Sequence, residues 1–155
     1  MKQLLSLYSE LQKAGVRFYT WDMNCSDAVT IEMDGQYNVF MDFDQIRTLA
    51  EEKVNVAHEG GHALTGATHK VSSPVDLIER HEYKANKWAI KKLLPKDELW
   101  AAIRHGYTEP WQLADYFNVT EPFICQAIQY YDHCGDVCGS SCTPDCGGDP
   151  QPDAD

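Results

Sequence analysis

Residues 58–62 read His-Glu-Gly-Gly-His, in the middle of a stretch whose apolar residues recur at helical spacing. The stretch runs from Asp44 to about Thr65, and Gly66 follows it as a helix-ending residue. A spacing of four residues places two side chains about 40° apart around a helix axis, one turn from each other. We therefore expect His58 and His62 to offer ring nitrogens to a single metal ion from one rigid helix.

Glu59 lies beside the first of these histidines, where a carboxylate can take a proton from a water molecule that a metal ion activates. A catalytic zinc site usually has a third protein ligand. We predict Glu82 for this role because it lies beside the apolar stripe of the next expected helix, which ends before Pro95. The first reason for this choice is Asn86, which follows Glu82 one turn later on the same face and is predicted to bond a ligating histidine. His81 is the rival third ligand.

Two consecutive glycines inside the motif also carry information. Gly60 and Gly61 each cost about 1 kcal/mol in a helix interior relative to alanine. We therefore expect tight packing or a close backbone approach at this point of the helix.

The surrounding sequence predicts an α+β fold that is mostly helical. Alternating apolar residues favour two strands joined by the turn signal Asp34-Gly35, that is, a small antiparallel β-sheet or hairpin before the motif helix. Further helices are predicted at residues 2–14, 73–94 and 97–105, and two more open at the cap signatures near residues 109 and 120.

The motif at residues 58–62, together with Glu-Tyr-Lys-Ala-Asn-Lys-Trp-Ala at 82–89 and Leu-Leu-Pro at 93–95, resembles the ImmA/IrrE metallopeptidase family. The similarity covers roughly residues 1–131 and implies a zincin-like metallopeptidase domain with one catalytic Zn²⁺. The family pattern uses two motif histidines and a downstream glutamate as zinc ligands, and a motif glutamate to activate water. Matched by position, the pattern implies these roles for His58, His62, Glu82 and Glu59.

The resemblance also implies a substrate. Many members of this family are encoded in prophages and mobile elements, where they cleave a helix-turn-helix transcriptional repressor. Two features depart from the family pattern. Gly60 stands where a larger apolar residue is usual, and the cysteine-rich segment at the end of the sequence has no counterpart there.

An alternative function stays open. The chain could be a catalytically silent, metal-containing protein-binding module that regulates a transcription factor by docking to it. The presence of Glu59 weighs against this alternative, because a structural zinc site needs no general base. The group that stabilises the developing oxyanion is undecided among Tyr83, His69 and His81.

Residues 109–131 resemble a helix-turn-helix and form a predicted helical subdomain. Residues 96–131 carry two basic and five acidic residues, a balance of −3. Since DNA affinity comes largely from basic residues that contact phosphates, we expect no direct nucleic-acid partner. A subdomain that packs on the peptidase core or docks a protein substrate is the favoured interpretation.

The whole chain is acidic, with a formal net charge of −11. Residues 132–155 hold six Asp and no Lys or Arg, which leaves 13 basic and 18 acidic residues elsewhere, a balance of −5. No apolar stretch is long enough to span a bilayer, and the first residues lack the apolar core of a signal peptide. We therefore expect a cytoplasmic protein that does not bind membranes.

A domain boundary is predicted after residue 131, where the hydrophobic period ends and Cys, Gly, Pro and Asp dominate. Residues 132–155 are predicted to be a flexible acidic tail. Its cysteines recur at every fourth position, and they could be free thiols, a second metal site or a redox pair. These are Cys134, Cys138, Cys142 and Cys146.

Overall fold

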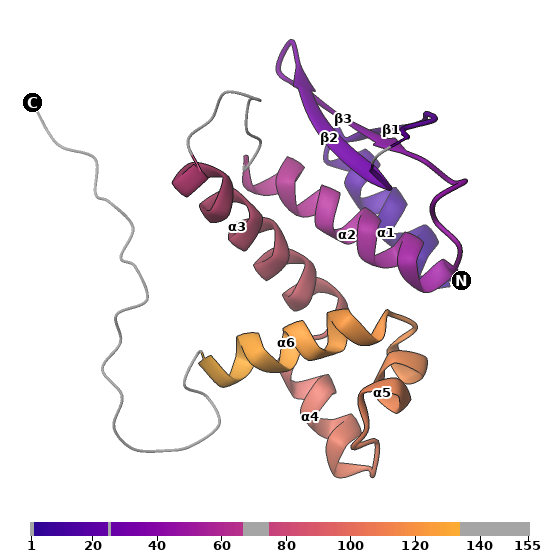
Figure 1. Ribbon diagram of the computed structural model, residues 1–155, viewed down its shortest axis with the longest axis vertical. Helices are drawn as coiled ribbons and strands as arrows, with labels where there is room; N and C mark the ends of the chain where they lie inside the picture. The colour runs from indigo at the N-terminus through magenta and orange to yellow at the C-terminus, as the bar shows by residue number, and fades with distance from the viewer. Residues whose placement is uncertain (1, 25, 67–74, 134–155) are drawn as a thin grey trace, which may run out of the picture.

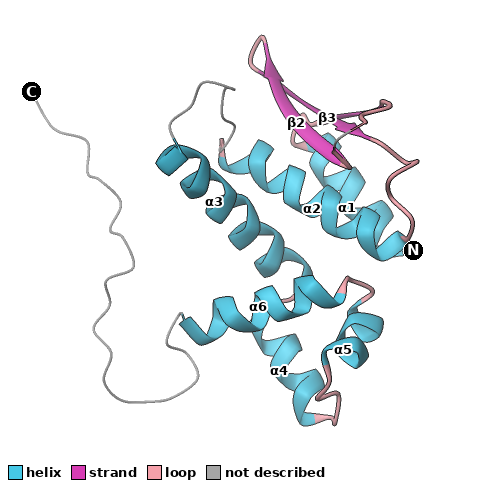
Figure 2. Cartoon of the chain, viewed as in Figure 1, coloured by secondary structure: helices cyan, strands magenta, loops and turns pink. Residues whose placement is uncertain are grey.

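A computed structural model describes residues 2–24, 26–66 and 75–133 of the chain. Its elements in chain order are α1 (Lys2–Lys13), β1 (Arg17–Thr20), β2 (Ala28–Met33), β3 (Gln36–Met41), α2 (Leu49–Thr65), α3 (Val75–Leu93), α4 (Lys96–Arg104), α5 (Pro110–Phe117) and α6 (Glu121–His133). Figures 1 and 2 show helices in the larger part of this arrangement and a small sheet at one end. The predicted α+β class, mostly helical with a small sheet, is confirmed.

The sheet has the strand order β1-β3-β2. Strands β2 and β3 pair antiparallel as the predicted hairpin, with Asp34 and Gly35 at positive φ in the turn between them. Strand β1 was not predicted, and it pairs parallel to β3, with Arg17 opposite Asn38. The predicted antiparallel sheet is thus wrong in one respect, because the observed sheet is mixed.

One face of the sheet packs on the first two helices. Figure 1 shows α1 and α2 side by side below the strands. Val39 and Met41 of β3 are buried on this side together with Leu11 of α1 and Val56 of α2. Because side chains alternate along a strand, the next residues of each strand point to the opposite face. The sheet therefore packs its buried face against the helix that carries residues 58–62.

Helix α2 begins at Leu49, five residues later than predicted. Thr48 has an extended backbone and caps the helix, since its Oγ1 accepts the Glu51 amide proton at 3.1 Å. The Glu51 carboxylate in turn accepts the Thr48 amide proton, which completes a capping box. Asp42 holds the preceding turn through its carboxylate, which accepts the Met23 and Asp44 amide protons. Because these bonds satisfy backbone groups in a turn, α2 does not extend back to Ile46, although the apolar residues there recur at helical spacing.

The C-terminal helices are tied to α2 and α3 by buried polar contacts. The Lys53 ammonium of α2 donates to the carbonyl oxygen of Phe117 at 2.7 Å and to Gln3 Oε1 at 2.8 Å. Burial lowers the pKa of Lys53 below its usual value. The Tyr131 hydroxyl of α6 donates to the Leu94 carbonyl oxygen at 2.8 Å. The predicted pair of helices in residues 109–131, now α5 and α6, therefore belongs to the same packed core.

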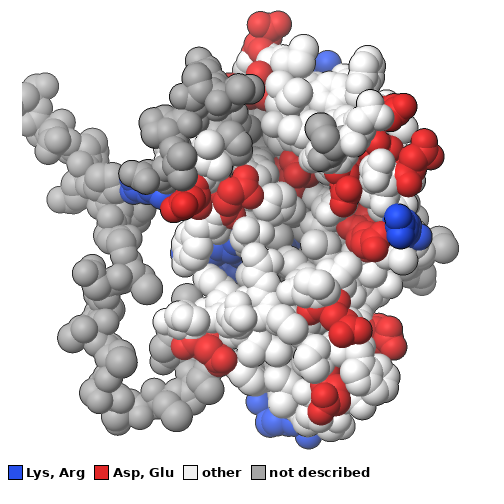
Figure 3. All heavy atoms as spheres, viewed as in Figure 1, with Lys and Arg blue, Asp and Glu red and all other residues white. Residues whose placement is uncertain are grey.

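Acidic side chains are spread over the molecular face shown in Figure 3, with fewer basic ones between them. Within the described ranges, none of the helices combines the length and the apolar character that crossing a membrane requires. Of the predicted tail, all but Asp132 and His133 falls outside the described residues.

A first prediction concerns Tyr8, whose hydroxyl donates to Glu52 Oε1 at 2.8 Å between α1 and α2. Tyr8→Phe should lower the free energy of unfolding by about 1–2 kcal/mol near pH 7, because a bond to a carboxylate is lost. Burial first, and then the bond to Glu52, raise the pKa of Tyr8 above its ordinary value of 10.0. The folded wild type thus keeps this proton when the unfolded chain releases it, so its advantage should shrink above pH 10.

Urea unfolding followed by circular dichroism, near pH 7 and near pH 11, measures both effects. A difference between wild type and Tyr8→Phe that stays constant across this range would contradict the prediction.

Candidate metal centre

The centre lies where α2 and α3 approach each other closely. A Cβ atom built on Gly61 would lie 2.6 Å from the carbonyl oxygen and 2.9 Å from the Cα atom of Ala85. One built on Gly60 would meet side-chain carbons of Leu11 at 2.7 and 2.8 Å. The close approach expected from the two glycines is present. It brings the side chains of the two helices within reach of one ion.

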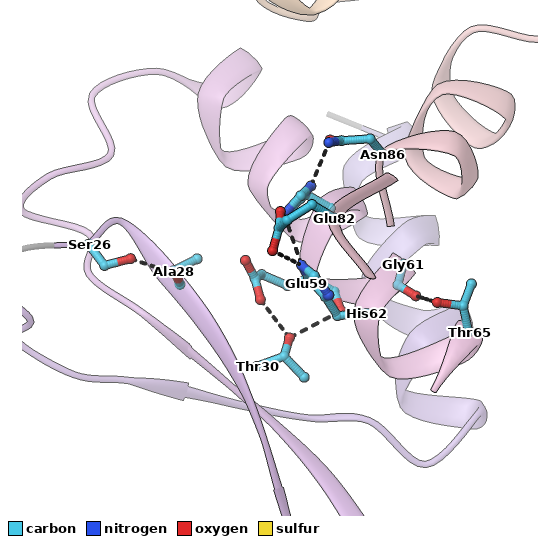
Figure 4. Close-up of polar contacts among 10 residues, drawn as sticks. Ser26, Ala28, Thr30, Glu59, Gly61, His62, Thr65, Glu82 and Asn86 are labelled. Atoms are coloured by element: carbon cyan, nitrogen blue, oxygen red, sulfur yellow. Dashed lines mark hydrogen bonds and ion pairs between the residues drawn. The ribbon is translucent and has the colours of Figure 1, made fainter. Parts of the chain in front are cut away.

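Three side chains converge at this crossing. His58 Nε2 lies 3.0 Å from His62 Nε2, and the two nitrogens lie 3.3 and 3.4 Å from the two carboxylate oxygens of Glu82. Within the described residues this is the group of His, Cys, Asp and Glu side chains that could hold a metal ion. Figure 4 shows Glu82 reaching from α3 toward His62 on α2.

The spacing of the donor atoms fits a small divalent cation. Ligand bonds of about 2.0–2.1 Å in a tetrahedral site place neighbouring donor atoms about 3.4 Å apart. The observed separations of 3.0–3.4 Å are close to this value. Two nitrogens and one carboxylate oxygen are also the donor set of many catalytic zinc sites. The residues present therefore fit zinc.

Asn86 determines which ring nitrogen of His58 carries the proton. Its Oδ1 atom lies 3.0 Å from His58 Nδ1, and an amide oxygen can only accept a hydrogen bond. The proton of a neutral His58 ring is therefore on Nδ1, so that Nε2 presents a lone pair toward His62 and Glu82. This is the tautomer that ligation of a metal through Nε2 requires.

Glu59 lies beside the group, and 7% of its surface is exposed. Its Oε2 atom accepts a hydrogen bond from the Thr30 hydroxyl at 2.6 Å, and Thr30 Oγ1 also lies 3.1 Å from the Glu59 carbonyl oxygen. Figure 4 shows the Glu59 carboxylate between Thr30 on one side and Glu82 on the other. The carboxylate is thus placed within the site and held from strand β2.

A groove of about 370 Å³ adjoins the centre between α3 and α6. Asn86 lines this groove and also contacts His58, so groove and centre share a side chain. The Lys87 ammonium lies 5.9 Å from the centroid of the Tyr83 ring in the same wall. The molecular face in Figure 3 is visibly hollowed near its middle, with basic atoms inside the hollow. The side chains of His58 and Glu82 are 25% and 40% exposed, so the centre itself is open to solvent.

The structure brings together all five side chains predicted for this site, namely His58, Glu59, His62, Glu82 and Asn86. His81, the rival ligand, is not part of the group. Tyr83 lines the groove, whereas His69 lies outside the described residues, as do the four cysteines of the predicted tail. Thr30 was not predicted. It is separated from Glu59 by 29 residues, and no local spacing signals the contact.

A peptidase family model, described as the IrrE N-terminal-like domain, matches residues 44–129, more than half of the chain. The match runs from just before α2 into α6 and includes the five side chains of the centre. No curated protein and no solved structure matches the chain.

Proposed function

The chain belongs to the IrrE N-terminal-like family of peptidases, and from this premise we propose that it is a zinc-dependent endopeptidase. One observation carries the proposal. The two histidine nitrogens and the Glu82 carboxylate lie at metal-ligand spacing, and Figure 4 shows the carboxylate of Glu59 beside them. A structural metal site would need only the two histidines and Glu82, whereas hydrolysis also needs Glu59.

The chemistry is divided between the ion and the chain. His58, His62 and Glu82 would hold a zinc ion, which would supply Lewis acidity to a peptide carbonyl and to the attacking water. Asn86 keeps His58 in the ligating tautomer. Glu59 accepts a proton from the attacking water and then passes it to the nitrogen of the leaving amine.

The position of β2 supports a peptide as the substrate. β2 is at one edge of the sheet, and in the described part of the chain its second edge pairs with no strand. Thr30 of this strand contacts Glu59, so this edge strand lies beside the carboxylate. An extended peptide can add to such an edge through main-chain hydrogen bonds.

For the substrate itself, we extend the proposal to a helix-turn-helix transcriptional repressor of a prophage or mobile element, with family membership as the support. Residues 1–131 would act as one peptidase domain, in which α5 and α6 serve packing or substrate docking. Such a substrate should appear shortened in cells that express the wild type and intact in cells that express Glu59→Gln. A proteomic search for shortened regulators compares the two.

The metal content of the purified chain tests the core of the proposal. We expect one zinc ion per wild-type chain. In His58→Ala and Glu82→Ala the affinity should fall by more than about a hundredfold, since even the loss of an outer hydrogen-bond partner of a metal ligand costs about 10–100-fold. Glu79→Ala is the matched control, because this exposed residue is on the same helix as Glu82 and outside the group. Mass spectrometry of metals gives the readout.

A fourth variant, with Ser replacing the cysteines at 134, 138, 142 and 146, addresses the cysteine segment. Zinc that remains in this variant and disappears from His58→Ala and Glu82→Ala supports the proposed centre. The reverse pattern would assign the metal to the cysteines, and the peptidase proposal would have to be abandoned.

A further inference from the structure

We propose that Thr30 is the positioning residue of the general base, an inference that rests on the proposed function. Its Oγ1 atom lies 2.6 Å from Glu59 Oε2 and 3.1 Å from the Glu59 carbonyl oxygen. A threonine hydroxyl has one proton, and Thr30 donates it to the carboxylate oxygen, which is the closer of the two acceptors. In the part of the chain that the structure describes, this is the hydrogen bond that the Glu59 carboxylate accepts.

The strand makes Thr30 a rigid donor. Thr30 is opposite Val39 in the antiparallel ladder, and Val39 is fully buried in the core. A β-branched side chain has few χ1 rotamers, and a paired strand restricts its backbone. The pairing within the sheet therefore restricts the position of Oγ1.

Glu59 needs such a donor, because a glutamate side chain on a helix has three rotatable bonds. The carboxylate is nearly buried, and a buried carboxylate without a partner is costly. The bond from Thr30 fixes one oxygen and leaves Oε1 available to a water molecule. In Figure 4 the oxygen that Thr30 does not bind is on the side of Glu82. The sheet thus orients a base that belongs to the helix.

The contact itself can be measured without turnover. In the full chain with ¹³C-labelled glutamate carboxyl groups, the resonance of Glu59 is identified by its absence in Glu59→Gln. We expect Thr30→Val to shift this resonance, both with and without added zinc, and Thr30→Ser to restore it. Thr20→Val is the matched control, since Thr20 is on β1 at the opposite edge of the sheet. Thr30→Ala provides a second variant without the hydroxyl if the valine variant does not fold.

The catalytic consequence is measured with a mixture of fluorescence-quenched peptides. Thr30→Val should lower kcat roughly tenfold or more with little change in KM, because only the orientation of the Glu59 carboxylate is lost. Thr30→Ser keeps the hydroxyl and should recover most of the rate. A Glu59 resonance that is unchanged in Thr30→Val, or an unchanged kcat, overturns the positioning role. A wild type that binds no zinc or cleaves nothing instead refutes the peptidase proposal, while the resonance still reports on Thr30.

Discussion

Glu59→Gln is expected to lower the rate of peptide hydrolysis by about 10²–10⁴-fold while the zinc content stays at the wild-type level. An amide has nearly the shape of a carboxylate and can still accept the bond from the Thr30 hydroxyl, but it cannot take a proton from water at neutral pH. The three proposed metal ligands are not changed, because Glu59 is outside the group formed by the two histidines and Glu82. Geometry and metal binding are thus retained, and the proton transfer is lost.

The mixture of quenched peptides measures the rate, and metal analysis of the same sample measures the zinc. Glu79→Gln, which changes the same functional group on the exposed surface of α3, serves as the control. Equal rates in wild type and Glu59→Gln would exclude Glu59 as the base. Loss of zinc in Glu59→Gln would instead give this residue a part in holding the metal.

Gly61→Ala should cause a larger structural effect than the same change at the neighbouring Gly60. The new Cβ atom would lie 2.6 Å from the carbonyl oxygen and 2.9 Å from the Cα atom of Ala85. These are backbone atoms, which cannot move away by a rotamer change as a side chain can. We expect overpacking to cost about 3 kcal/mol, of which the better helix preference of alanine restores about 1 kcal/mol. Helix α3 has to move away from α2, which takes Glu82 away from the two histidines and weakens zinc binding.

Gly60→Ala is the matched control on the neighbouring residue. Its Cβ atom would meet the end of the Leu11 side chain, which can change its rotamer. We therefore expect a smaller loss of stability and little loss of zinc. Urea unfolding and zinc titration of both variants separate the two cases. Equal effects at the two positions would contradict a specific role for the crossing of α2 and α3.

Much of the centre was predictable because its information is local. The spacing of His58 and His62 on one helix determines their relative direction, and the spacing of Glu82 and Asn86 does the same on the next. The choice of Glu82 over His81 rested on Asn86 one turn later on the same face and on the apolar stripe beside Glu82. Such periodic signals do not depend on where the helices end.

The rest depended on contacts between distant residues. Strand β1 has four residues, follows a turn at Gly15 and pairs with β3 about twenty positions later, so it leaves no period in the sequence. The partner of Glu59 is Thr30, a residue type that is common on strands for reasons of packing alone. The start of α2 was misplaced because apolar spacing near Ile46 continues across the turn that Asp42 holds. Spacing alone does not show which side chain satisfies a backbone group.

The bond between Lys53 and Phe117 also has a consequence for the chain during its synthesis. The two residues are 64 positions apart, a distance that a ribosome covers in roughly 3–13 s at common elongation rates. Until Phe117 has been made, the ammonium of Lys53 has Gln3 Oε1 as a partner but lacks the buried carbonyl oxygen of Phe117. Helix α2, which carries both histidines, therefore completes its packing only when α5 has emerged, and the half of the protein with the candidate metal centre matures late in translation.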